Sequence, residues 1–331
     1  MRSIVPSFLL LLGFVGITPF VNAEEKAPAV KETKGKVIIT LYGDFHSGFG
    51  SQKDNRHFFL DRAYLGYQYQ IGKELKIKAV LDAGRSKEVD DLQRIAYLKD
   101  ASLTWKHKRL TLAAGLISTT QFQLQNKSWN KRYIQKTFQD EYKFGHSADL
   151  GVSIGYAFTS RFSADAILTN GDGYKKIELK DGLHYGLGIT FKPIEGWVIR
   201  AYGSLNETDD KSLKDVYNLS FFTGYRYKGW SIGGEYNYMF NAQNQMGKHR
   251  SGASAFTDLQ VHRKIALYAK WDYVLSKDNW NLEKDGMAGI IGADFMLGKY
   301  VRLSPNFRIW SPADKSASKE YYAYLNFAFF L

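Results

Sequence analysis

The stretch LKIKAVLDAG, residues 75–84, alternates two kinds of side chain with a period of two. Leu75, Ile77 and Ala79 occupy one set of positions, and the intervening positions are mostly polar. Successive side chains of a β-strand point to opposite faces, so this pattern predicts a strand with one apolar and one polar face. The same alternation recurs along the chain and decides the fold.

The alternation extends on both sides of this stretch. Strands are predicted at 36–46, 62–70 and 75–84 and near 94–105, 109–117, 149–158, 161–170, 183–192, 197–205, 215–227, 230–240, 254–262, 265–274, 287–297, 300–310 and 321–331, about sixteen in all. Tight turns, as at 72–74 and 228–229, alternate with longer loops, as at 47–57 and 118–148. This rhythm is typical of outer-membrane barrels, so we expect an all-β, antiparallel transmembrane barrel over residues 36–331.

The apolar face is expected to meet lipid. It consists of Leu, Ile, Val, Ala and Phe, with aromatic residues toward strand ends: Trp105, Trp197, Tyr225, Tyr227, Trp230, Tyr236, Tyr238, Trp271 and Tyr273. Aromatic residues that flank an apolar band resemble the interfacial girdles of membrane barrels. A soluble barrel is the alternative, but the polar face carries too many glycines and charges for it. Lipid offers backbone groups no partners, so the sheet is expected to close.

The polar face is expected to line a water-filled lumen. Its charges are mixed, with a slight excess of basic residues. The basic members are Arg62, Lys76, Lys78, Lys192, Arg200, Arg226, Lys270, Arg302 and Arg308, and the acidic ones Asp44, Asp82, Asp100, Asp165, Glu235, Asp272 and Asp294.

Residues 118–146, STTQFQLQNKSWNKRYIQKTFQDEYKFGH, do not alternate. A structureless connection of this length is uncommon in a compact domain and is usually functional or disordered. Disordered segments are poor in aromatic residues. This one contains Phe122, Trp129, Tyr133, Phe138, Tyr142 and Phe144, so we expect it to pack against another part of the chain, with a disordered surface loop as the alternative.

The first 23 residues predict export. Arg2, an apolar run at 4–20 and Val21-Asn22-Ala23 form a secretory signal peptide with cleavage before Glu24; an uncleaved anchor is the alternative. Residues 24–35 read as a short periplasmic lead. The net charge of +12 would suit a nucleic-acid binder, but the basic residues are dispersed and the chain is exported, so no nucleic-acid partner is expected.

The sequence contains no sign of catalysis. It has no cysteine, which excludes disulfides, cysteine-ligated zinc and a thiol nucleophile. No HExxH signature occurs, and the seven histidines are scattered. We expect no catalytic residue, metal or cofactor.

Several segments together resemble one family. They are FLDRAYLGY at 59–67, Lys127-x-Trp129, FQDEYKFG at 138–145, ADLG at 148–151 and NGDGY at 170–174. They resemble porins of the phosphate-selective porin O/P type, most closely the branch common in Bacteroidetes.

The resemblance implies a 16-stranded, usually trimeric channel whose third extracellular loop folds inward and narrows the pore. Residues 118–146 are the third long loop by the strand count, which makes Lys127, Lys131, Arg132, Lys136, Asp140, Glu141 and Lys143 candidate constriction residues. Phosphate-selective members use an arginine ladder and a lysine cluster. Arg62, Arg200, Arg226, Arg302 and Arg308 could form such a ladder, but the interleaved acidic residues dilute its field.

We therefore expect a passive channel for small hydrophilic solutes with a mild anion preference, in the outer membrane of a Gram-negative cell. Its partners would be membrane lipid, two further copies of the chain and the barrel-assembly machinery. The alternating C-terminal strand 321–331 resembles the signal that this machinery recognises, although it ends in Leu331 where an aromatic residue is usual. The alternatives are a phosphate- or polyphosphate-selective channel, a non-conducting structural or adhesive barrel and, more distantly, a lipid hydrolase.

Overall fold

The structure is a computed structural model that describes residues 34–85, 94–176 and 182–331. The predicted signal peptide at 1–23 and the predicted lead at 24–35, apart from its last two residues, lie outside the described residues. Those two residues, Lys34 and Gly35, belong to the first strand, which begins two residues earlier than predicted.

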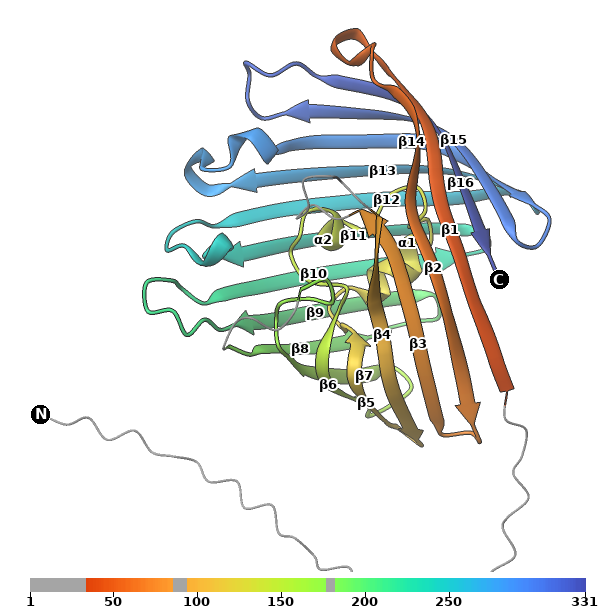
Figure 1. The fold of residues 1–331 in the computed structure, drawn as a ribbon, viewed down its shortest axis with the longest axis vertical. Helices are drawn as coiled ribbons and strands as arrows, with labels where there is room; N and C mark the ends of the chain where they lie inside the picture. The colour runs from red at the N-terminus through yellow and green to blue at the C-terminus, as the bar shows by residue number, and fades with distance from the viewer. Residues whose placement is uncertain (1–33, 86–93, 177–181) are drawn as a thin grey trace, which may run out of the picture. The chain divides into compact units, whose positions relative to one another are not determined.

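The described chain forms a closed antiparallel barrel (Figure 1). Its strands are β1 (Lys34–Phe49), β2 (Arg56–Ile71), β3 (Leu75–Arg85), β4 (Arg94–His107), β5 (Leu110–Ser118), β6 (Ala148–Ala157), β7 (Phe162–Thr169), β8 (His184–Phe191), β9 (Trp197–Asn206), β10 (Val216–Tyr227), β11 (Trp230–Phe240), β12 (Arg250–His262), β13 (Ile265–Ser276), β14 (Gly286–Leu297), β15 (Val301–Pro312) and β16 (Glu320–Phe330). Each strand pairs with its neighbours in sequence, and β16 pairs with β1. The predicted 16-strand barrel is confirmed.

Short and long connections alternate as predicted. The turn between β10 and β11 contains Lys228 and Gly229, both with positive φ (43° and 82°), as a two-residue primed turn requires. The first two strands are longer than predicted: β1 reaches Phe49 and β2 begins at Arg56, so the loop predicted at 47–57 is shorter. Backbone pairing such as Ser47 with Arg56 continues there because ladder hydrogen bonds do not depend on side-chain alternation.

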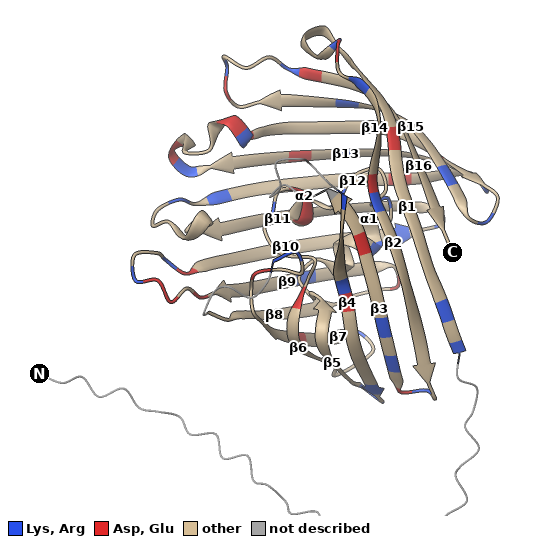
Figure 2. Ribbon diagram, in the orientation of Figure 1, with Lys and Arg blue, Asp and Glu red and all other residues tan. Residues whose placement is uncertain are grey.

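The two faces of the sheet are also as predicted. On β13, Leu267 and Trp271 are 47% and 41% exposed on the outside, whereas Lys270 and Asp272, on the other face, are 4% and 1% exposed on the inside. Basic and acidic residues are spread around the barrel instead of forming one stripe (Figure 2). An apolar exterior around a polar interior is the arrangement of a membrane barrel and reverses that of a soluble one.

Helical structure among the described residues is confined to loops. The helices α1 (Gln123–Trp129) and α2 (Phe138–Glu141) both lie in the connection between β5 and β6, and Figure 1 shows them within the ring of strands. Short 3-10 turns occur at Gly50–Gln52, Ala242–Asn244, Lys277–Asn279 and Leu282–Lys284. No helix in the described part of the chain is both long and apolar enough to cross a membrane.

Candidate functional site: a loop inside the barrel

The connection between β5 and β6, residues 119–147, turns into the barrel, and we call it the inner loop. Its large aromatic side chains are buried: Phe122, Trp129, Phe138 and Phe144 are each at most 2% exposed. The first helix ends at Trp129 and is capped by Asn130, whose left-handed backbone (φ 48°) is a conformation that asparagine tolerates better than most residues. The aromatic residues therefore pack inside the protein.

The apolar side of the inner loop rests on β12 and β13. The ring centroid of Trp129 lies 5.4 Å from that of Phe256 and 5.9 Å from that of Tyr268. Phe138 approaches Gly252 so closely that a Cβ at position 252 would lie 2.3 Å from its ring. The wall thus has a glycine at a point where the loop needs room.

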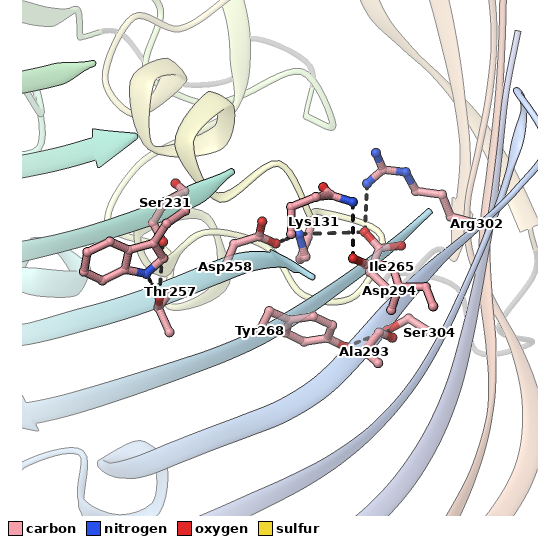
Figure 3. A network of polar contacts seen from close by, with 12 residues as sticks. Lys131, Ser231, Thr257, Asp258, Ile265, Tyr268, Ala293, Asp294, Arg302 and Ser304 are labelled. Atoms are coloured by element: carbon pink, nitrogen blue, oxygen red, sulfur yellow. Dashed lines mark hydrogen bonds and ion pairs between the residues drawn. The ribbon is translucent and has the colours of Figure 1, made fainter. Parts of the chain in front are cut away.

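A buried charge network holds the middle of the inner loop (Figure 3). The ammonium of Lys131, only 4% exposed, donates to Asp258 of β12 and lies 3.7 Å from Asp294 of β14. Asp294 also accepts from the hydroxyl of Tyr133 at 2.7 Å and from Arg302 of β15 at 2.9 Å. Burial lowers the pKa of Lys131 to about 8, although Asp294 opposes that shift. The ammonium of Lys131 therefore has two carboxylates of the wall, Asp258 and Asp294, beside it.

Two arginines of the wall bind backbone carbonyls of the inner loop. Arg200 donates to the carbonyl of Thr120 at 3.0 Å and Arg308 to that of Ile134 at 2.8 Å. Arg200 also pairs with Asp165 at 2.6 Å. Both residues were predicted to line the lumen. They do face inward, but the Nη groups of Arg200 and Arg308 bind the loop and neighbouring wall residues.

Amide side chains make a further contact with the wall. Gln139 is fully buried and donates to Glu235 of β11 at 3.1 Å. Asn237 donates to the same carboxylate at 3.2 Å, and Gln121 donates to Gln139 at 2.7 Å. The inner loop is thus fastened along β9–β16 by polar as well as apolar contacts.

On the opposite side, between the inner loop and the wall of β2–β7, lies a cavity of about 660 Å³. Its charged lining is mainly basic: Lys76, Lys78, Lys99, Lys127 and Arg132 against Asp100 and Asp165. Lys78 pairs with Asp100 at 2.8 Å. Lys127 lies on α1 and is exposed. The side of the lumen that the loop leaves open therefore has a positive excess.

The other predicted constriction residues pair within the inner loop. Arg132 contacts Asp140, and Lys136 lies 4.0 Å from Glu141. Burial of the Asp140 carboxyl would raise its pKa, but the adjacent Arg132 outweighs this and holds the pKa below its usual range. Lys143 is exposed and has a left-handed backbone (φ 58°) just after α2.

The arginines proposed as a ladder do not lie on one row of neighbouring strands. Arg62 is on β2, Arg200 on β9, Arg226 on β10, and Arg302 and Arg308 on β15. Arg62 contacts the fully buried Asp82. Arg226 is exposed and donates to the carbonyl of Ser128 at 3.4 Å.

Sequence reasoning missed residues of the wall that faces the loop. Arg62 and Asp82 both contact the hydroxyl of Tyr174, at 2.9 and 2.5 Å. Lys99 donates to the hydroxyl of Tyr64 at 3.2 Å. Lys99 was not among the residues predicted to face the lumen. It is the extra residue of a β-bulge: Val80 pairs with Asp100 and Leu81 with Leu98. A bulge shifts the alternation by one residue, so Lys99 can join Asp100 on the inner face. Tyr174 was quoted only as part of a motif.

No metal centre is apparent in the described part of the chain: no group of three or more His, Cys, Asp or Glu side chains there could hold an ion. Histidine–carboxylate contacts do occur, as between His46 and Asp44 at 2.6 Å, and the ring of His46 also packs against those of His57 and Tyr324.

Comparison with known proteins shows which structures have a similar fold. No protein-family model and no curated protein matches the chain. The structure is similar to OmpF of Salmonella typhi (TM-score 0.69, 11% identity, covering 90% of this chain and 98% of that one). It is also similar to the anion-selective porin from Comamonas acidovorans (TM-score 0.66, 10% identity, 91% and 100% covered) and to OmpT of Vibrio cholerae (TM-score 0.61, 13% identity, 90% and 98% covered). The chain therefore has the fold of a 16-strand, porin-like outer-membrane β-barrel.

Proposed function

We propose that this protein is an outer-membrane porin, a passive diffusion channel for small hydrophilic solutes with a mild anion preference. The proposal includes a signal peptide at residues 1–23, ahead of the barrel, whose first strand begins at Lys34. No catalytic step and no cofactor belongs to it. The observation that carries it is the one-sided seat of the inner loop.

The inner loop narrows the lumen without being fastened all around it. Its polar anchors among the described residues, such as Lys131 with Asp258 and Gln139 with Glu235, are on strands of the β9–β16 half. The cavity on the β2–β7 side is the route that we assign to solutes. A solute would pass between the loop and that wall, in contact with the residues that line the cavity.

The anion preference follows from the charges along this route. Lys76 and Lys127 line the cavity and form no ion pair with any residue that the structure describes. Lys131, in contrast, is buried between two carboxylates and would hold the loop in place instead of meeting solutes. Charge lining a narrow aqueous path selects ions of opposite sign.

The test is the reversal potential of the refolded protein in a planar bilayer under a potassium chloride gradient. We expect the sign for anion preference, and a shift toward cations in Lys76→Gln and Lys127→Gln. Lys211→Gln, on the exposed loop between β9 and β10, is the matched control and should leave the potential unchanged. Cation selectivity of the unaltered protein would contradict the proposal, and absence of conductance would favour a structural or adhesive barrel.

A channel selective for phosphate or polyphosphate is the second candidate. It is favoured by the resemblance of residues 59–67 and 138–145 to the phosphate-selective porin O/P type and by the lysines of the cavity. Submillimolar phosphate should then block chloride current. Unchanged current in phosphate would leave the general porin.

We also propose that the protein assembles as a homotrimer. The resemblance in sequence implies this state, and a trimer form of the structurally similar OmpT of Vibrio cholerae supports it. Analytical ultracentrifugation of the detergent-solubilised protein, with bound detergent subtracted, would give the mass of the assembly. A mass of one chain would contradict the proposal.

A further inference from the structure

Tyrosine rings and lysines alternate on β2, β4 and the connection between β7 and β8. The ammonium of Lys99 lies 4.9 Å from the ring centroid of Tyr64 and 4.9 Å from that of Tyr174. The ammonium of Lys175 lies 4.8 Å from the ring centroid of Tyr97. The rings of Tyr97 and Tyr174 meet edge to face with centroids 6.4 Å apart. We call these five residues the tyrosine–lysine track.

The two lysines of the track differ from the other cations around them. Arg62 is paired with Asp82 and Arg132 with Asp140, but neither Lys99 nor Lys175 forms an ion pair with a carboxylate among the described residues. Burial and the neighbouring Arg62 lower the pKa of Lys175, with Asp82 opposing. The track thus holds two lysines without a carboxylate partner among the described residues: Lys99 donates to the Tyr64 hydroxyl at 3.2 Å, and Lys99 and Lys175 each lie within 4.9 Å of a tyrosine ring centroid.

Ring faces determine which anion fits beside these lysines. The face of a tyrosine ring is electrically negative, so it attracts an ammonium and repels a bare anion. A flat ring, in contrast, gains contact with Tyr64, Tyr97 or Tyr174 in offset or edge-to-face geometry. An anion that joins a charged group to a ring can satisfy both parts of the track, whereas chloride, acetate or phosphate can satisfy only the lysines.

The track leads to the cavity beside the inner loop. Tyr64 and Lys99 line that cavity together with Arg132 and Lys127. Tyr174 and Lys175 come from the connection between β7 and β8, on the long-loop side of the barrel. A solute that enters from the long-loop side would therefore meet the track before the cavity.

We propose that the tyrosine–lysine track is a binding site for organic anions that carry a flat ring, with aromatic carboxylates as the matching class. The site rests on the proposed function and deepens it, because it names the solutes that the channel would take up by preference. The carboxylate contacts Lys99 or Lys175, and the ring lies against the tyrosines.

The experiment compares benzoate, acetate and phosphate as blockers of chloride current through single channels. We expect benzoate to reach half-block at a concentration roughly fivefold lower than acetate, since one favourable ring contact supplies about that factor. Tyr64→Leu should bring the two concentrations together, whereas Tyr64→Phe keeps the ring and should retain most of the difference. Tyr97→Leu and Tyr97→Phe repeat the test should Tyr64→Leu fail to fold. Equal block by benzoate and acetate, or stronger block by phosphate, would overturn the proposal.

A calorimetric titration of the folded protein in detergent separates this proposal from the proposed function. Benzoate is titrated into unaltered protein, Tyr64→Leu and protein-free micelles, so that partitioning into detergent is subtracted. Binding that depends on the Tyr64 ring in a barrel without conductance would uphold the site and overturn the channel. Conductance with no ring-dependent benzoate binding would uphold the channel and overturn the site.

Discussion

The hydroxyl of Tyr133 on the inner loop donates a 2.7 Å hydrogen bond to Asp294 of β14, a residue 161 positions further along the chain. Asp294 also receives Arg302 at 2.9 Å, and Lys131 lies 3.7 Å from it. One carboxylate of the wall thus joins the loop to the barrel. The course of the inner loop consequently depends on the closed barrel, in which Asp294 of β14 and Arg302 of β15 lie within reach of the loop.

Lys131→Met should release the inner loop. The substitution removes the hydrogen bond that Lys131 donates to the half-buried Asp258 and the donor beside the buried Asp294, and an acceptor left unsatisfied in the interior costs about 1–3 kcal/mol. The free energy of unfolding in urea, measured in lipid vesicles, is the readout. Lys127→Met alters an exposed lysine of the same loop and should change it by only about 0.5 kcal/mol or less. Similar losses in both variants would contradict the assignment.

Stability should depend on pH through Lys131. The folded-state pKa of this lysine is about 8, whereas an unfolded lysine titrates near about 10.4. Between these values the unfolded chain binds more protons than the folded one, so the contribution of Lys131 to the free energy of unfolding rises with pH. The difference between unaltered protein and Lys131→Met should grow by up to about 1.4 kcal/mol per pH unit across this window. Parallel pH profiles of the two proteins would refute this.

Gly252→Ala should disturb the seat of α2. A Cβ there would lie 2.3 Å from the ring of Phe138 and 2.5 Å from the carbonyl of Tyr273, and such overpacking costs about 1–3 kcal/mol. Urea unfolding and open-channel noise measure the effect. Gly234→Ala on the neighbouring strand β11 is the control, because its Cβ would meet only the carbonyl of Ser254 at 3.5 Å, an ordinary contact. Equal behaviour of the two variants would count against the packing.

Asp82→Asn should strengthen the anion preference. Asp82 is fully buried beside Arg62, and the amide keeps the shape of the side chain while leaving the arginine without its counter-charge. We expect the reversal potential in a salt gradient to move further in the anion direction. Asp209→Asn, in the exposed loop between β9 and β10, removes the same charge far from the cavity lining and should have little effect. A shift toward cations in Asp82→Asn would exclude Arg62 from the selective path.

For the predicted constriction residues, local sequence patterns indicated burial of the aromatic side chains but not the position of each lysine. The aromatic content of residues 118–146 indicated that the segment packs, and Phe122, Trp129, Phe138 and Phe144 are buried. It did not indicate which lysines meet solvent. Lys127 and Lys131 are four positions apart in similar surroundings, yet one is exposed and the other is enclosed by Asp258 and Asp294. Those partners lie on strands that no local pattern connects to the loop.

The sequence by itself determined the barrel: the strands, their two faces, and the alternation of short turns with long loops. These features are local, because side-chain direction in a strand has a period of two and lipid leaves the backbone no partners except neighbouring strands. Only the tertiary structure decided how the loop lies, because Trp129 needs Phe256 and Lys131 needs Asp258, more than a hundred residues away. It also decided the inward position of Lys99, since a bulge shifts the alternation on which sequence reasoning depends.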